Sequence, residues 1–198
     1  MNPSDATIRV FIALDIAPEA RRALLAAMRE LQTAIPNGVR WVDPAGIHLT
    51  LKFLGHIDPN LVEPVLQGMR GSAEGTAPFQ LRLFDLGLFP NARQPRVLWA
   101  GVAGELKPLE GLQQRVDESV SPLGFPRERQ PFRPHLTLGR VREGVASAIR
   151  SQIGATLYAI PLGPSEPWLV DAVHLISSTL TPTGAIYASL GSVPLWQK

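Results

Sequence analysis

The tetrapeptide His-Leu-Thr-Leu occurs twice in this chain of 198 residues, at 48–51 and at 135–138, and it holds two of the four histidines. Each copy is flanked by apolar residues, as in a buried strand, where residues i and i+2 point to the same face. His48 and Thr50 should therefore share one face of their strand, and His135 and Thr137 one face of theirs, with the leucines pointing the other way. Two strands that each present an imidazole and a hydroxyl suit acid–base chemistry by two histidines.

The elements that must position these motifs alternate between strands and helices. Strands are expected near 9–15, 39–42, 47–54, 79–88, 96–102, 135–141, 172–177 and 187–193. Helices are expected near 19–33, 106–120 and 146–153, with another after Asp58-Pro59. Because the two histidine strands occupy comparable places in two halves, we predict an α+β fold of two pseudo-symmetric lobes. The lobes should consist mainly of antiparallel sheets with helices outside, enclose a cleft, and form one bilobal domain over residues 1–198.

Composition narrows the possible functions. The 45% hydrophobic content is ample for a core, and the absence of cysteine excludes disulfides, thiolate catalysis and cysteine-bound zinc. A net charge of +2 fits an ordinary surface as well as a nucleic-acid partner. Met1–Asp5 does not resemble the start of a signal peptide, and no uncharged apolar run is long enough to span a bilayer. We therefore expect a cytoplasmic protein that does not bind membranes.

The chain resembles the 2H phosphoesterases, whose name refers to two His-x-Thr-x motifs, and more narrowly the bacterial RNA 2′,3′-cyclic phosphodiesterases, also called 2′-5′ RNA ligases. The resemblance covers nearly the whole chain. It rests on the order and flanking residues of RVFIAL at 9–14, WV at 41–42, HLTLKFLG at 48–55, RVLWAG at 96–101 and PFRPHLTLGR at 131–140. The segment 155–171 departs from the family by its extra proline and glycine.

The resemblance implies hydrolysis of RNA or nucleoside 2′,3′-cyclic phosphate ends to 2′-phosphomonoesters, with reversible 2′-5′ joining as a side capacity. By resemblance, His135 is the base toward water and His48 the acid toward the departing 3′ oxygen; exchanging the roles describes the reverse reaction. Thr50 and Thr137 would donate to the non-bridging phosphate oxygens. Two imidazoles with ordinary pKa values predict a bell-shaped pH profile around neutrality. No cofactor or metal is expected.

Other residues are candidate substrate contacts. The family carries an arginine at the position of Arg140 as a phosphate partner, although regular alternation places it on the face opposite to the histidine unless a bulge intervenes. Arg133 and Lys52 are further phosphate-binding candidates. Phe11 and Trp41 could stack on a terminal base, but large apolar residues in strands more often belong to the core.

The two remaining histidines, His56 and His174, lie outside any His-x-Thr pattern. We expect His56 to be exposed at a strand end, and His174 to face the polar side of its sheet.

Two rival functions remain open from the residues alone. A metal-dependent phosphoesterase would use the histidines as ligands, but it would need clustered carboxylates, and Asp43 is the nearest. A non-catalytic module that binds RNA ends would keep the cleft without turnover. For an enzyme, other 2H substrates such as ADP-ribose 1″,2″-cyclic phosphate remain possible. The expected partners are RNA ends or cyclic nucleotides, bound by a monomer.

Overall fold

The computed structural model describes residues 7–162, 165–181 and 184–196, so Met1–Asp5, discussed above for targeting, lies outside the described residues. Within them, nine strands form one sheet in the order β7-β4-β5-β6-β3-β1-β8-β9, with β2 paired to β6. Every pairing between these strands is antiparallel. The strands are β1 (Ile8–Leu14), β2 (Val39–Trp41), β3 (Leu49–Ile57), β4 (Phe79–Phe89), β5 (Val97–Gly104), β6 (His135–Val141), β7 (Trp168–Val170), β8 (Ala172–Thr181) and β9 (Gly184–Pro194).

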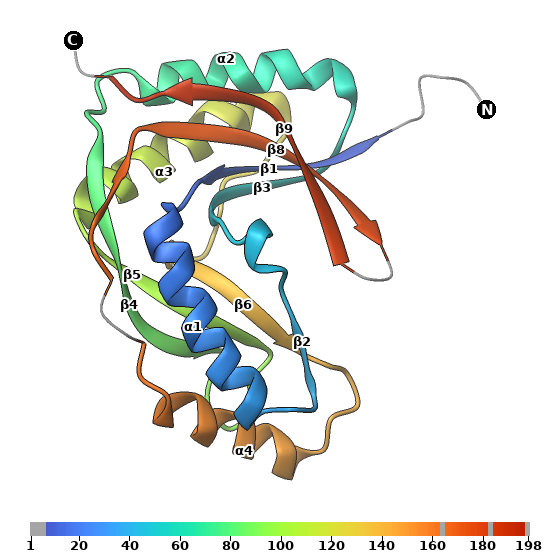
Figure 1. Cartoon of the computed structure of the whole chain (residues 1–198). Coiled ribbons are helices and arrows are strands. Elements are labelled where there is room, and N and C mark those ends of the chain that lie inside the picture. The colour runs from blue at the N-terminus through green and yellow to red at the C-terminus, as the bar shows by residue number, and fades with distance from the viewer. Residues whose placement is uncertain (1–6, 163–164, 182–183, 197–198) are drawn as a thin grey trace.

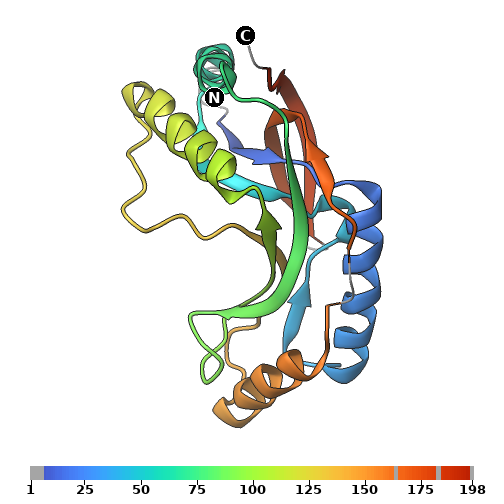
Figure 2. The same cartoon turned by 90° about the vertical axis from the view of Figure 1, so that its left-hand side faces the viewer.

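Four α-helices cover the described sheet: α1 (Pro18–Ala34), α2 (Val62–Ala73), α3 (Leu106–Val120) and α4 (Ser147–Ala159). Helices α2 and α3 pack on each other and against β9 and β3, whereas α4 packs against β4 and touches α1. Figures 1 and 2 show α2 and α3 at one end of the curved sheet and α4 at the other, with α1 running from the middle of the molecule toward α4. No described helix is long and apolar enough to cross a membrane.

The sheet consists of two lobes that meet at a narrow seam. One lobe holds β3, β1, β8 and β9, and the other holds β6, β5, β4 and β7, with β2 beside β6. At the seam, β3 and β6 share a single registered pair, Leu49 with Leu136. This arrangement confirms the predicted α+β fold of two antiparallel lobes with helices outside (Figure 1).

The alternation predicted for the two motifs is also confirmed. Leu49, Leu51, Leu136 and Leu138 are all at most 3% exposed. The histidine and threonine of each motif are half-buried, on the face opposite to those leucines. The leucine layer therefore anchors both motifs in the core while their polar side chains face away from it.

Both motifs are followed by a β-bulge at the same position. In the pairing of β5 with β6, Trp99 lies opposite Thr137 and Leu98 lies opposite Gly139, so Leu138 has no partner. Leu138 and Gly139 are consecutive buried residues, and the exposed Arg140 returns to the face of the histidine. The structure thus supplies the bulge that Arg140 requires to reach the histidine face.

The first motif repeats this irregularity. Ala13 of β1 pairs with Thr50 and Ile12 with Lys52, so Leu51 is skipped. Leu51 and Lys52 are both buried, and Phe53 emerges at the position equivalent to Arg140 with 58% of its surface exposed. The two halves therefore share backbone irregularities that the tetrapeptide repeat alone does not reveal.

Several boundaries differ from the sequence prediction. Strand β3 continues past Gly55, whose φ of +75° suits glycine at a second bulge, so His56 is exposed within the strand and not beyond its end. Helix α4 runs six residues further than expected, to Ala159. Strand β7 was missed because its three residues follow a stretch rich in proline and glycine and are recognised only by their pairing with β4.

Lys52 is not a phosphate ligand in this structure. Its side chain is 3% exposed, and its ammonium donates to Asp117 Oδ1 at 2.5 Å and to the carbonyl of Pro126 at 2.6 Å. Asp117 also accepts from the backbone N–H of Glu128 at 3.1 Å. A buried lysine needs such partners because an unpaired charge is costly to bury. The ion pair and its neighbouring hydrogen bonds tie the loop between α3 and β6 to β3 and α3, at Pro126 and Glu128.

Replacing Asp117 by Ala should lower the free energy of unfolding by about 3–5 kcal/mol, because it leaves the Lys52 ammonium buried without its counter-charge. Urea unfolding followed by circular dichroism measures the change. The matched control is Arg70→Ala, which breaks an exposed pair with Glu63 and should cost at most about 1 kcal/mol. Equal stabilities of the two variants would contradict an anchoring role for the buried pair.

Candidate active site

The first histidine is held by the turn that precedes its strand. His48 lies between the 3-10 helix η2 (Pro44–Gly46) and β3, and its Nδ1 is 2.7 Å from the carbonyl oxygen of Gly46. A carbonyl only accepts, so Nδ1 carries a proton and donates it. The tautomer is thereby fixed, and Nε2 is left as the nitrogen that can exchange a proton with a substrate.

The second histidine repeats this arrangement. His135 Nδ1 is 2.6 Å from the carbonyl oxygen of Arg133, again two residues earlier in the chain. Since β3 and β6 are antiparallel about the Leu49–Leu136 pair, the register extrapolated from this pair sets each histidine opposite the threonine of the other motif. Strand spacing and a two-residue offset place the two histidine Cα atoms roughly 8 Å apart. The structure thus brings both motifs to one seam.

Aromatic rings contact each imidazole. Phe11 stacks on His48 with ring centroids 4.3 Å apart, and Tyr187 meets the same imidazole edge-on at 5.4 Å. On the other side of the seam, Phe89 meets His135 edge-on at 5.0 Å. These contacts restrict the rotamers of both histidines.

The expected stacking of Phe11 on a base is contradicted by its burial. Phe11 is 1% exposed, and its ring supports His48 from within the sheet, so no face is open to a nucleobase. Trp41 is half-buried and packs against the core.

Burial lowers the pKa of both histidines below the ordinary imidazole value. For His48 the largest cause is loss of hydration, opposed by the Gly46 hydrogen bond and by the nearby Asp15 carboxylate, while Arg21 lowers the pKa further. For His135 desolvation again dominates, the Arg133 carbonyl opposes it, and the charge of Arg140 lowers the pKa further. The two sites therefore differ in one respect: only His48 has a carboxylate that favours its protonated form.

The other predicted residues lie as follows. Thr50 and Thr137 are half-buried, and within the described residues neither hydroxyl has a hydrogen-bond partner, so both can donate to a ligand. Arg140 is exposed on β6 and acts electrostatically on the second histidine. The Arg133 side chain is exposed and lines a hollow beside His135.

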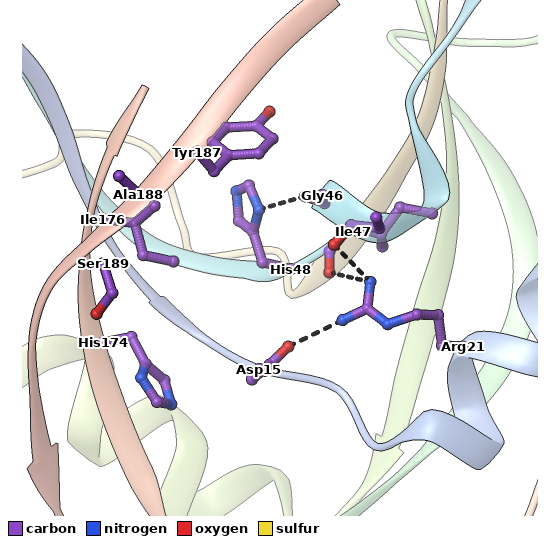
Figure 3. Close-up of a pocket in the computed structure, with 11 residues that line it drawn as sticks. Asp15, Arg21, Gly46, Ile47, His48, His174, Ile176, Tyr187, Ala188 and Ser189 are labelled. Carbon is purple, nitrogen blue, oxygen red and sulfur yellow. Dashed lines mark hydrogen bonds and ion pairs between the residues drawn. The ribbon is translucent and has the colours of Figure 1, made fainter. Parts of the chain in front are cut away.

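A hollow adjoins each histidine. The His48 hollow, about 220 Å³, is lined by Asp15, Arg21, Ala45, Gly46, Ile47, His48, His174, Ile176, Tyr187, Ala188 and Ser189 (Figure 3). The His135 hollow, about 370 Å³, is lined by Phe84, Phe89, Trp99, Gly101, Val102, Phe132, Arg133, Pro134 and His135. The seam is therefore flanked by one polar and one aromatic hollow.

The described residues contain no group of three or more histidine, aspartate or glutamate side chains placed to hold a metal ion. Asp43, the carboxylate nearest to the first motif in sequence, caps η2 by accepting from the N–H of Ala45 at 2.9 Å. Its position is therefore explained by the turn it stabilises.

Arg21 is a residue of the site that sequence reasoning missed. From α1 its guanidinium donates to the carbonyl of Pro44 at 2.5 Å. It also donates to the carbonyls of Ala45 at 3.0 Å and Ile47 at 3.3 Å and pairs with Asp15 at 3.0 Å (Figure 3). It thus clamps the turn whose Gly46 carbonyl holds His48. The three carbonyls lie 23–26 residues away in the chain, and no pattern within one segment predicts such a contact.

Comparison with known proteins agrees with this duplicated geometry. The pattern of the LigT like Phosphoesterase family matches the chain twice, over residues 14–99 and 102–187, so each match contains one histidine motif. The RNA 2′,3′-cyclic phosphodiesterase of Archaeoglobus fulgidus is 33% identical over 186 residues, covering 92% of this chain and 98% of the relative. That of Geobacillus stearothermophilus is 35% identical over 156 residues, which cover 76% of this chain but only 49% of the relative.

Solved structures share the fold. Protein TT0787 of Thermus thermophilus superposes with a TM-score of 0.73 at 30% identity, over 95% of this chain and 98% of that one. E. coli LigT in apo form gives a TM-score of 0.73 at 22% identity, over 96% of this chain and 99% of that one. The architecture is therefore that of a known group of bilobal proteins.

Replacing Arg21 by Gln should lower kcat by roughly 10- to 100-fold with little change in KM, because a loosened η2 turn lets His48 shift by about 1 Å from its productive position. Arg21→Lys should not restore kcat, since one ammonium cannot reproduce the fork of contacts to three carbonyls and Asp15. Steady-state kinetics and NMR of the His48 tautomer are the measurements. Arg22→Ala, on the adjacent exposed position, is the control and should behave as wild type; an unaltered kcat in Arg21→Gln would contradict the clamp.

Proposed function

Because the chain belongs to the LigT like Phosphoesterase family, we propose that it hydrolyses 2′,3′-cyclic phosphate ends of RNA or nucleosides to 2′-phosphomonoesters by acid–base catalysis with two histidines. The observation that carries the proposal is the pair of imidazoles at one seam, each with Nδ1 bound to a carbonyl and Nε2 left for the substrate. Relatives that match nearly the whole chain bear the name RNA 2′,3′-cyclic phosphodiesterase.

The proposed mechanism follows from the protonation states of the two histidines. His135 as the neutral base takes a proton from water, the resulting hydroxide attacks phosphorus, and the P–O3′ bond breaks as His48 donates a proton to the departing 3′ oxygen. Thr50 and Thr137 donate hydrogen bonds to the non-bridging oxygens, where negative charge grows. Arg140 adds a positive charge on the same side. We propose that 2′-5′ joining follows the same course with the 5′-hydroxyl of a second RNA in place of water: His135 takes its proton, the 5′ oxygen attacks phosphorus, and His48 protonates the departing 3′ oxygen. The two imidazoles exchange their roles when the 2′-5′ bond is cleaved again.

The electrostatic difference between the histidines supports this assignment. An arginine lowers the pKa of each histidine, Arg21 for His48 and Arg140 for His135, but only His48 also has a carboxylate, Asp15, that favours its protonated form, as the acid requires. The sequence offered no basis for this distinction beyond resemblance.

The proposal extends to partners and organisation. The structure of E. coli LigT, a protein of the same fold, has been determined in complex with 3′-AMP, which supports a nucleotide ligand. Each lobe contributes one histidine, so the site is complete in one chain, and we take residues 1–198 to act as one bilobal, monomeric and cytoplasmic unit.

His48→Ala and His135→Ala should each reduce kcat by about 10²–10⁴-fold while leaving the melting temperature nearly unchanged, because both rings face the seam and not the core. Turnover of 2′,3′-cyclic AMP in the presence of EDTA is the assay, and a nucleoside 2′-phosphate is the expected product. Thr50→Ala and Thr137→Ala should be milder, since each removes one neutral donor.

The exposed His56→Ala is the matched control for these variants and should retain full activity. Near-normal turnover in either catalytic variant would refute the two-histidine mechanism. Loss of wild-type activity in EDTA that returns with a divalent metal would favour the metal-dependent rival. Tight binding of cyclic nucleotides with no turnover would favour an RNA-end binding module.

The pH profile of kcat/KM should be a bell displaced to the acidic side of the neutral optimum that two ordinary imidazoles give, because burial lowers the pKa of both histidines. The base must be neutral, so activity rises as the pH rises through the pKa of the base. The acid must be protonated, so activity falls as the pH rises through the pKa of the acid.

Arg140→Gln removes a charge that lowers the pKa of His135. The acidic limb of the kcat/KM profile of this variant should therefore move to higher pH. An acidic limb that stayed in place or moved to lower pH would contradict the role of His135 as the base.

A further inference from the structure

His174 lies on the same face of the sheet as the catalytic seam. Thr50 of β3 pairs with Ala13 of β1, and Ala13 pairs with His174 of β8, so the three residues form one row across neighbouring strands. Val173 and Leu175 on either side are fully buried, which turns the half-buried His174 to the opposite face. A third histidine thus stands two strands away from the first motif.

The His48 hollow connects the first histidine with His174. Ala13, which lies between Thr50 and His174 in the row, is fully buried and does not line the hollow. Both His48 and His174 line it, and Figure 3 shows it with His48 and Tyr187 on one side and His174 and Ser189 on the other. At about 220 Å³ it is smaller than the usual pocket for a drug-sized ligand and suits a single small ring system.

The lining combines apolar contact with hydrogen-bonding groups. Ile176 and the Tyr187 ring supply apolar surface, while the His174 imidazole and the Ser189 hydroxyl can both donate and accept. Within the described residues His174 has no hydrogen bond or ion pair, so its imidazole is available to a ligand. Apolar walls with a few polar groups are what a planar heterocycle requires.

We propose that the His48 hollow is the subsite for the nucleobase of the nucleotide that carries the cyclic phosphate, with His174 as its specificity-determining residue. This inference rests on the proposed function, in which His48 protonates the 3′ oxygen. That oxygen belongs to the ribose of the terminal nucleotide, so the ribose lies on the His48 side of the phosphorus. The base attached to this ribose then extends away from the seam, past His48 into the hollow and toward His174.

Steady-state kinetics of His174→Ala with the 2′,3′-cyclic phosphates of adenosine, guanosine, cytidine and uridine test the proposal. Loss of one hydrogen bond to the base should raise KM about 3- to 10-fold, by an amount that differs between bases, with kcat within about twofold of wild type. The inhibition constant of the product, for example 2′-AMP, should rise in parallel. With 1-O-methylribose 2,3-cyclic phosphate, which has no base, the variant and wild type should be equal.

His56→Ala is the matched control, an exposed histidine on β3 away from the hollow, and should leave every constant unchanged. His174→Gln, which keeps a donor and an acceptor, should recover part of the affinity and also serves if the alanine variant fails to fold. Melting temperatures identify such a failure.

Three results would overturn the inference. An equal loss with the substrate that lacks a base would assign His174 to the ribose or to the fold. Unchanged constants for all four nucleotides would leave it without a role in binding. A rise in KM in Phe84→Ala, at the His135 hollow, without one in His174→Ala would place the base on the other side of the seam. Absence of wild-type turnover of any cyclic nucleotide would instead refute the proposed function itself.

Discussion

The whole site depends on two short hydrogen bonds, each from a histidine Nδ1 to the carbonyl oxygen two residues earlier. They fix the tautomer and orientation of both imidazoles, and with them the position of each reactive Nε2. Because each acceptor is a backbone carbonyl oxygen, its position is fixed only when the segment that contains it is fixed. Much of the surrounding structure therefore stabilises the turn before β3 and the loop before β6, in addition to contacting the histidines directly.

The two segments are held by different means. The turn before β3 is held by Arg21, which donates hydrogen bonds to three of its backbone carbonyls, and by Asp43, which caps it. The loop before β6 is tied at Pro126 and Glu128 through the buried pair of Lys52 and Asp117. The lobes are thus similar in backbone but not in the chemistry that supports it. The charges around the histidines differ as well, since both Asp15 and Arg21 act on His48, whereas, among the described residues, Arg140 alone acts on His135.

The narrow seam explains how a duplicated motif becomes one site. With only the Leu49–Leu136 pair in register, β3 and β6 keep the motifs adjacent while the lobes diverge on both sides. Each lobe has a hollow beside its own histidine; charged and polar side chains line much of the first, and aromatic side chains line much of the second. A pseudo-symmetric fold thereby offers unlike surroundings on the two sides of the reacting phosphorus, which a directional reaction requires.

The sequence by itself determined the two motifs, the faces on which their side chains lie, and elements such as α3 and β6, whose bounds match the prediction. Local periodicity is sufficient for these because it records which side of a strand or helix is buried. Only the tertiary structure decided that Arg140 returns to the histidine face, that Lys52 is buried and that His174 borders the site. Those outcomes depend on bulges and on contacts between segments distant in the chain, which the pattern within one segment does not encode.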